Sequence, residues 1–226
     1  MATAEADICN KALARIGITE YIDDLTTDQS EEAQTCNVFY TDLRDACLAA
    51  FPWPFATLRQ VLTIKADEPL RDGWRNVFAL PAKCLKPRKI WPTGLNVALF
   101  QAYPFLPGQV PPVSMNPRTP RSDQRIPYAI EKSSTDDTQV LLCDLDTPSL
   151  FYTAQVTDPV KFPPMFVEAL AWLIASEIAS PLTKDPKKVA YAEQKYNRVI
   201  REAWADALNS VQEDIPPDSE MIIGRL

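Results

Sequence analysis

The chain has 226 residues, of which 46% are apolar and 23% charged, so it resembles an ordinary soluble globular protein of one large or two small domains. A net charge of −7 argues against specific DNA recognition, because an acidic surface repels phosphates. The absence of histidine removes the commonest general base and metal ligand, and five glycines are too few for a glycine-rich phosphate loop.

The five cysteines are odd in number and form no CxxC pair. Cys9, Cys36 and Cys47 fall on apolar faces of predicted helices, which favours buried free thiols in a reducing cytosol. A disulfide framework or a zinc site is the alternative. The first residues lack the pattern of a signal peptide, and no apolar run is judged long enough to span a bilayer, so no membrane partner is expected.

A first helix is predicted over residues 4–16, with Thr3 as its N-cap and Gly17 ending it in a left-handed turn. A second helix is predicted from a capping box at Asp28 and Glu31 up to Pro52. Its apolar face is Cys36, Phe39, Tyr40, Leu43, Ala46, Cys47 and Ala50, and its solvated face is Asn37, Thr41, Asp42 and Arg44.

The stretch after this helix holds three aromatic residues, Phe51, Trp53 and Phe55, between two prolines. Proline fixes φ and keeps the preceding residue extended, which predicts a stiff junction where a helical part meets a β part. Rings of this size must be buried against something, so these three residues are predicted to pack the junction.

Residues 57–156 are predicted to form a β-rich insertion, a small sandwich or barrel. The expected strands lie at 58–64, 74–80, 89–91, 128–131, 139–143 and 149–154. A proline-rich arm at 104–127 interrupts them, and it is expected to order against a neighbouring subunit. Its Arg118, Arg121 and Arg125 suit intersubunit ion pairs or solvation, with phosphate contact as the alternative.

Two further helices are predicted after the insertion, one from Pro163–Pro164 to Pro181 and one from Pro186 to about Val211. The expected inward residues are Phe166, Leu170, Leu173, Ile174 and Ile178 in the first, and Val189, Ala192, Tyr196, Val199, Ala203 and Leu208 in the second. The fold class is therefore α+β, a four-helix bundle of residues 1–56 and 157–212 interrupted by the insertion.

Residues 213–226 form a polar stem followed by an apolar end. Exposed apolar residues in such a segment indicate a peptide that docks on another chain, and a disordered end is the alternative. The candidate docking residues are Ile215, Met221, Ile222, Ile223, Arg225 and Leu226.

Candidate catalytic groups are few. Two acidic pairs, Asp136 with Asp137 and Asp144 with Asp146, offer the oxygen ligands that Mg²⁺ or Ca²⁺ prefers. Aspartates are also common in turns for structural reasons, and no two-metal pattern surrounds these pairs. The lysines that could serve as a base are most simply solvated surface residues. No catalytic residue, metal site or cofactor is predicted, and an enzyme is not expected.

Four segments resemble the tail tubular protein A family, the head-to-tail adaptors of short-tailed bacteriophages. Residues 8–17 resemble its opening helix, and residues 44–46 with 51–56 its second-helix end and aromatic turn. Residues 79–85 are similar to its ALP-type strand end, and residues 162–171 to its late helix. The segments follow in the family's order over nearly the whole chain, but the arm has no clear counterpart.

The resemblance implies a structural virion protein of the tail or neck, made in the host bacterial cytoplasm. It implies a ring, a dodecamer in that family, between the portal and the tail nozzle or tube, with DNA passing non-specifically through its channel. The C-terminal segment would dock between portal subunits. The alternatives are a carboxylate- or metal-dependent hydrolase of a phage particle, and a binding module for a tail fibre or receptor-binding protein.

Overall fold

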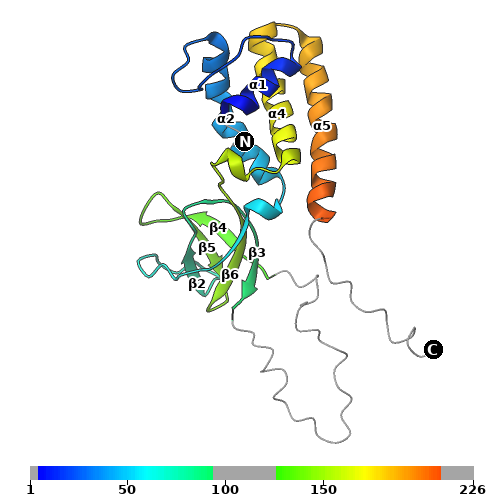
Figure 1. The fold of residues 1–226 in the computed structure, drawn as a ribbon. Helices are drawn as coiled ribbons and strands as arrows, with labels where there is room; N and C mark the ends of the chain where they lie inside the picture. Colours follow the sequence, from blue (N-terminus) through cyan, green and yellow to red (C-terminus); the bar gives the residue numbers. More distant parts are fainter. Residues whose placement is uncertain (1–4, 94–125, 210–226) are drawn as a thin grey trace, which may run out of the picture. The chain divides into compact units, whose positions relative to one another are not determined.

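Helices formed by both ends of the chain and strands formed by its middle make up the fold (Figure 1). It is described from a computed structural model, which covers residues 5–93 and 126–209. The chain divides into a helical unit, from residues 1–55 and 156–226, and a β unit, from residues 56–155. The predicted α+β class, helices interrupted by a β-rich insertion, is confirmed.

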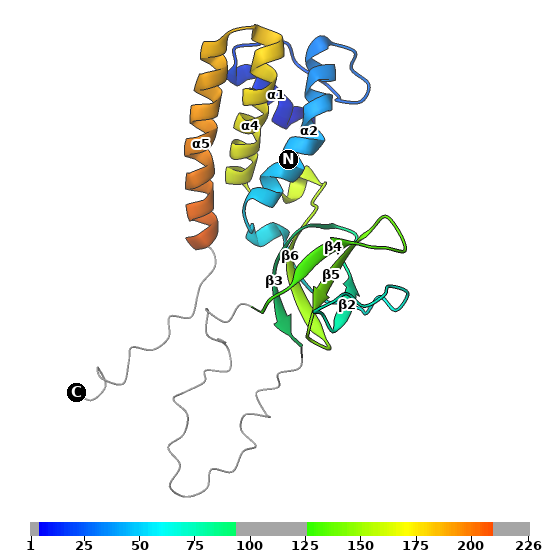
Figure 2. The ribbon, with the colours of Figure 1, turned by 180° about the vertical axis from the view of Figure 1, so that it is seen from behind.

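The described helical unit contains α1 (Glu5–Arg15), α2 (Glu31–Ala50), α4 (Pro164–Thr183) and α5 (Pro186–Asn209). Helix α4 is central, because it packs on each of the other three (Figures 1 and 2). Ten of its residues are buried, which makes it the core of the unit. By length and composition α4 could cross a membrane, so the prediction that no apolar run is long enough to span a bilayer was wrong. In this fold the apolar side chains of α4 pack against the other helices.

The ends of α1 and α2 follow local capping rules. Gly17 has a φ of +79° and ends α1 in the predicted left-handed turn, while the Thr3 cap lies outside the described residues. At α2 the predicted capping box was wrong: the Ser30 hydroxyl caps the helix by accepting from the Ala33 N–H at 3.3 Å. The carboxylate of Asp28 instead accepts from the Ser30 N–H, which shapes the preceding turn.

Helix α2 buries a different stripe from the predicted one. Cys36, Tyr40 and Cys47 are buried as expected, but Arg44, assigned to the solvated face, is only 4% exposed. Phe39 and Leu43 are half-buried, Ala46 and Ala50 are exposed, and Leu48 is buried.

The two late helices begin and end near their predicted positions, but the residues that they bury differ in part from those predicted. Helix α4 begins at Pro164 and continues past the expected stop at Pro181 to a left-handed cap at Lys184. In α4 the predicted inward residues are buried apart from the half-buried Leu173, whereas in α5 Leu208 is exposed. The buried residues of α5 are Ala192, Ile200, Ala203 and Ala207.

The β unit consists of two three-stranded antiparallel sheets, ordered β1-β6-β3 and β2-β5-β4. The strands are β1 (Thr57–Val61), β2 (Asn76–Ala79), β3 (Cys84–Pro92), β4 (Ala129–Lys132), β5 (Gln139–Cys143) and β6 (Pro148–Ala154). The sheets share a core to which Phe78 and Leu141 contribute from one side and Leu150 and Tyr152 from the other. The arrangement is that of a small sandwich.

The run predicted as one strand over 58–64 serves both sheets. After β1 ends, the Leu62 N–H still donates to the Pro148 carbonyl at the start of β6, and the Lys65 N–H donates to the Val77 carbonyl on β2. Strand β3 is also longer than the predicted 89–91. It accommodates Pro87 as an edge strand whose register is irregular beside this residue, the setting in which strand prolines are normally found.

All five cysteines are free thiols, as predicted, and all except the half-buried Cys84 are buried. Burial raises the pKa of the Cys47 thiol to about 12. The thiol is therefore protonated and unreactive at neutral pH.

Candidate functional site

The aromatic junction residues lie in a cluster within the helical unit, formed by Phe51, Trp53, Phe55, Phe162, Phe166 and Trp204. The Trp53 and Phe166 rings meet edge to face with centroids 5.1 Å apart, and the Phe55 ring meets Phe166 at the same distance. Phe51 stacks on Trp204 of α5 at 5.5 Å. This aromatic cluster therefore joins the end of α2 to both late helices.

The backbone after α2 is shaped as predicted. Phe51, before Pro52, is extended with φ −137° and ψ 150°, and the next proline opens a short 3₁₀ helix at Pro54–Ala56. Trp53 is 2% exposed, while Phe51 and Phe55 are half-buried. These residues form a packing site and not a pocket for a ligand.

Helix α1 is tied to α4 by a second polar and aromatic contact. The guanidinium of Arg15 pairs with the Glu168 carboxylate and lies 4.4 Å from the centre of the Trp172 ring. The Trp172 indole N–H donates to the same carboxylate at 3.1 Å. The Glu168 carboxylate thereby fixes the positions of the Arg15 and Trp172 side chains.

The outer surface of sheet β1-β6-β3 carries four cations, Arg59, Lys86, Arg88 and Lys89, and is called here the basic face. The three strands contain no Asp or Glu. At its centre Phe151 on β6 is flanked by both edge strands, with Arg59 5.1 Å and Lys89 5.0 Å from the ring centre. Arg88 is held to the Thr153 hydroxyl at 2.9 Å.

The loop that leads into β2 of the other sheet carries a buried carboxylate, Glu68, whose side chain is 0% exposed. It accepts from the Ser133 and Ser134 hydroxyls at 2.6 and 2.8 Å and pairs with Arg71 at 2.6 Å. Because the hydrogen bonds from Ser133 and Ser134 favour the ionised form, they lower the pKa of Glu68 to about 2. Glu68 thus fastens the 65–75 loop to the hairpin between β4 and β5.

The carboxylates considered for metal binding do not converge. Asp136 accepts from Lys65 at 2.7 Å in the hairpin before β5, and Asp144 accepts from the Arg75 N–H at 3.0 Å after β5. A five-residue strand separates the two pairs by roughly 16 Å. No group of three or more Cys, Asp or Glu side chains suited to a metal occurs in residues 5–93 and 126–209.

A serine–lysine pair at this hairpin belongs to a cluster of hydrogen bonds that joins two loops. The Lys65 ammonium donates to the Ser133 hydroxyl at 3.0 Å, but it also pairs with Asp136. All of these acceptors belong to the β4–β5 hairpin, so the ammonium serves to hold the 65–75 loop to that hairpin.

The remaining predicted site residues lie outside the described residues. They are Arg118, Arg121 and Arg125 of the arm, and Ile215, Met221, Ile222, Ile223, Arg225 and Leu226 of the C-terminal segment.

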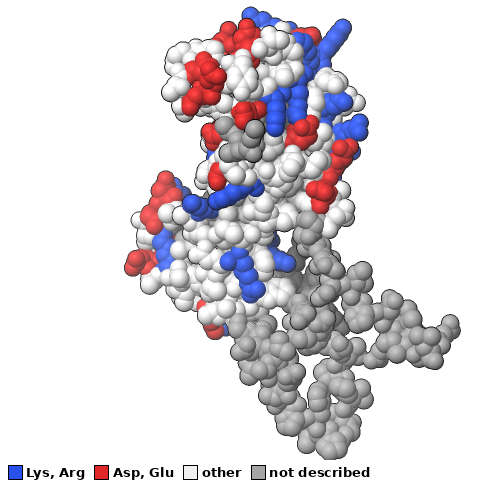
Figure 3. Space-filling view, in the orientation of Figure 1, with Lys and Arg blue, Asp and Glu red and all other residues white. Residues whose placement is uncertain are grey.

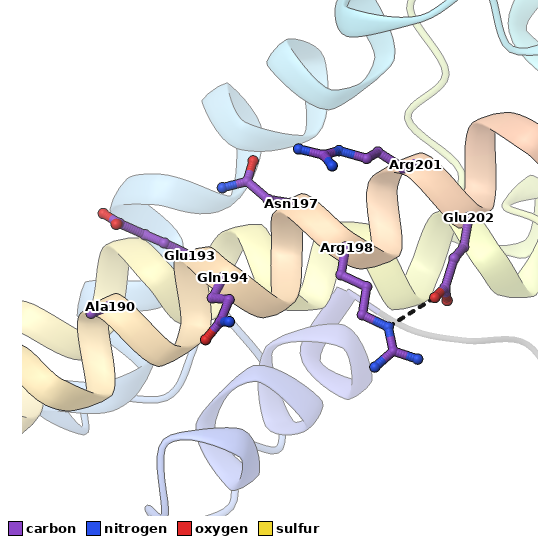
Figure 4. A pocket seen from close by; sticks show the side chains of 7 residues that line it. All are labelled: Ala190, Glu193, Gln194, Asn197, Arg198, Arg201 and Glu202. Atoms are coloured by element: carbon purple, nitrogen blue, oxygen red, sulfur yellow. Dashed lines mark hydrogen bonds and ion pairs between the residues drawn. The ribbon is translucent and has the colours of Figure 1, made fainter.

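A hollow of about 680 Å³ lies along α5, and all its described lining residues belong to that helix (Figure 4). Glu193, Gln194, Asn197 and Arg201 project from it separately, and Arg198 pairs with Glu202 in the manner of a solvated i,i+4 pair. The described part of this lining, the side chains of one helix, does not by itself enclose a small molecule. This polar surface is better suited to contact with a protein.

The basic face is the feature that sequence reasoning missed. Its signal is the run Lys86-Pro87-Arg88-Lys89, in which only a short strand at 89–91 was predicted. Pairing across β6 places Lys86 opposite Thr153 and Lys89 opposite Phe151, so both lysines share a face that Arg59 joins from strand β1.

Comparison of the chain with protein-family models finds no match, and comparison with curated proteins finds none that is significant. The function is therefore argued from the residues and their geometry.

Proposed function

We propose that this chain is a structural protein of a short-tailed bacteriophage, an adaptor that forms a ring between the portal and the tail nozzle or tube. The ring, a dodecamer in the family that the sequence resembles, would be located in the neck or tail of the virion after synthesis in the bacterial cytoplasm. It would let DNA pass without binding it, which suits a net charge of −7.

The observation that carries the proposal is the meeting of three of the four adaptor-like segments in one packed assembly. Arg15 of the opening segment pairs with Glu168 of the late one. Trp53 and Phe55 of the aromatic turn pack on Phe166 of that same late segment. Residues that lie as far as about 150 positions apart in the sequence are thus in direct contact. Such contacts are expected if the resemblance reflects a shared fold.

The chemistry of the described residues fits a structural role. The two acidic pairs lie at opposite ends of β5, and Glu68, Arg71 and Lys65 are used in joining loops. We therefore assign the residues named above to shape and subunit contact. The alternative of a carboxylate-dependent hydrolase gains no support from their placement.

Residues 213–226 are proposed to dock on the portal. The acidic stem gives reach, Ile215, Met221, Ile222, Ile223 and Leu226 are the apolar anchors, and Arg225 would meet a portal carboxylate. The arm at 104–127, with Arg118, Arg121 and Arg125, is proposed to contact a neighbouring subunit.

The test is binding of the purified chain to the portal protein of the same virus, followed by electron microscopy. The full chain should form rings on the portal, and a chain lacking residues 216–226 should stay folded but lose binding. Two full-length variants distinguish the apolar anchors from the acidic stem. Replacing Met221, Ile222 and Ile223 by serine should abolish portal binding. Glu213→Gln with Asp214→Asn should weaken portal binding less. Normal portal binding by the shortened chain would refute the docking role, and failure of the full chain to bind would refute the adaptor proposal.

A further inference from the structure

Charge is divided between the two sides of the β unit. The basic face carries four cations and no carboxylate in its strands. The loops beside the other sheet, residues 65–75, 133–138 and 144–147, contain seven carboxylates and three cations, a net charge of −4. They are called here the acidic side. Figure 3 shows acidic side chains gathered at the loop edge of the β unit and basic ones over β3 and β6.

Three cations of the basic face are available to a partner. Arg59, Lys86 and Lys89 are exposed, and none forms an ion pair within residues 5–93 and 126–209. Arg59 and Lys89 are instead held at a fixed place by the Phe151 ring between them. An ordered cation loses less side-chain entropy on binding than a free one.

The acidic side is also rigid. Its 65–75 loop spans β5 from end to end, because Glu68 holds it to the hairpin before that strand and the Arg75 N–H holds it to Asp144 after it. The exposed carboxylates carried on this frame are Asp67, Asp72, Asp136, Asp137, Asp144 and Asp146.

Exposed apolar residues accompany both charged surfaces. Leu58 and Val61, on edge strand β1 beside the basic face, are 50% and 48% exposed. Leu70 and Ile130 are exposed beside the acidic side. A polar rim around apolar contacts is the usual composition of a protein interface, and an uncovered edge strand is normally protected or used.

We infer that the basic face and β1 edge of one copy pack against the acidic side of the β unit in the next copy. The contact joins two different surfaces, so repeating it head to tail closes a ring when the rotation between copies permits. The inference rests on the proposed adaptor ring and names the surfaces by which its subunits touch.

The observations favour a second copy over nucleic acid as the occupant. The molecule is acidic overall, which opposes a DNA duplex, and both neighbours of Phe151 are cations that occupy the ring and hinder base stacking. The acidic side of the same chain offers opposite charge on a similarly rigid frame. DNA binding is kept as an outcome of the test.

The first experiment is zero-length carbodiimide cross-linking of the full chain, alone and on the portal, in an equal mixture of ¹⁴N- and ¹⁵N-labelled protein. Mass spectrometry should find mixed-isotope links from Lys86 or Lys89 to carboxylates of the acidic side. Lys187, which is exposed on α5, is the control and should give none of these links.

The second experiment reverses charges on the two surfaces. Self-association is measured by analytical ultracentrifugation, and ring formation on the portal by counting rings in electron micrographs. Arg59→Glu with Lys89→Glu should weaken self-association about ten-fold or more at low salt. Adding Asp72→Lys and Asp137→Lys to the same chain should restore it, because the two reversed cations can then pair with the two reversed carboxylates. Lys187→Glu should change nothing.

The outcomes separate the inference from the proposed function. Rings that assemble normally with the Arg59 and Lys89 reversals, or that show no mixed-isotope links at these lysines, would overturn the inference and leave the adaptor proposal intact. The same holds if the reversals abolish binding to a DNA duplex and leave self-association unchanged. A chain that assembles neither alone nor on portal would overturn both.

Discussion

The indole N–H of Trp53 donates to the carbonyl of Cys47, 2.9 Å away, and so satisfies one of the four carbonyls that α2 leaves unpaired at its end. The bond is buried and turns the ring back toward the helix it follows. There it meets Phe166 of α4 edge to face. One side chain thus ends α2 and packs it against the central helix.

Replacing Trp53 by alanine should lower the free energy of unfolding by about 3–5 kcal/mol, because it removes a fully packed ring and leaves the Cys47 carbonyl unpaired. Trp53→Phe should cost less, since most of the ring volume stays. Val38→Ala, at an exposed position of α2, is the control. Denaturant unfolding followed by circular dichroism measures all three, and a Trp53→Ala loss no larger than the control's would show that the ring is not part of the core.

Acid should destabilise the β unit through Glu68. Its pKa is held at about 2 in the folded chain, below the ordinary value of 4.5, so the unfolded state binds the proton more readily. The stabilisation is complete above pH 4.5 and is lost as pH falls from 4.5 toward 2. In Glu68→Gln the slope of stability against pH should be shallower in this window. Thermal melts between pH 2 and 6 measure the slope, and an unchanged slope would contradict the assignment.

Sequence patterns located most strands of the β unit, because these are short runs of apolar and β-branched residues bounded by proline or polar turn residues. Strand β5 was predicted at its observed bounds, and β6 was one residue short. The register and the two-sheet division could not be predicted, since they depend on pairings between distant segments. The basic face was missed for this reason: Arg59 and Lys89 are adjacent only once β6 lies between them.

Periodicity was less reliable in the helices, where a long polar residue can be buried by tertiary contacts. Arg44 has the polarity of a solvated residue and was assigned to that face of α2, but it lies in the core. The ring contacts of Trp53 were foreseen only as a need for burial. Its partner Phe166 on α4 comes from more than 100 residues later, beyond the reach of local spacing.

The buried Arg44 gives a further prediction. Its Nε donates to Asp45 at 2.9 Å and its guanidinium lies 5.9 Å from the Tyr40 ring centre. Removing the carboxylate with Asp45→Ala leaves a buried cation without this partner and should cost about 3 kcal/mol. Arg44→Met removes the charge and keeps most of the volume, so it should cost less. If chemical denaturation gives the reverse order, Arg44 is stabilised mainly by other groups.

The end of α1 gives the last prediction, because two independent features meet there. Gly17 adopts φ +79°, where a side chain is strained, and the Lys188 ammonium of α5 donates to the Ile16 carbonyl at 2.7 Å. A Cβ on Gly17 would lie 3.5 Å from that ammonium, an ordinary contact, so the cost of Gly17→Ala should come from backbone strain alone.

We expect Gly17→Ala to lower the free energy of unfolding by about 1–2 kcal/mol and Gly17→Asn by less, since asparagine tolerates the left-handed region. Lys188→Met should cost a similar 1–2 kcal/mol, because it removes a charged donor at a helix C-terminus. As the two residues adjoin, a double mutant measures their coupling. Equal losses for Gly17→Ala and Gly17→Asn would show that the left-handed turn is not what limits this position.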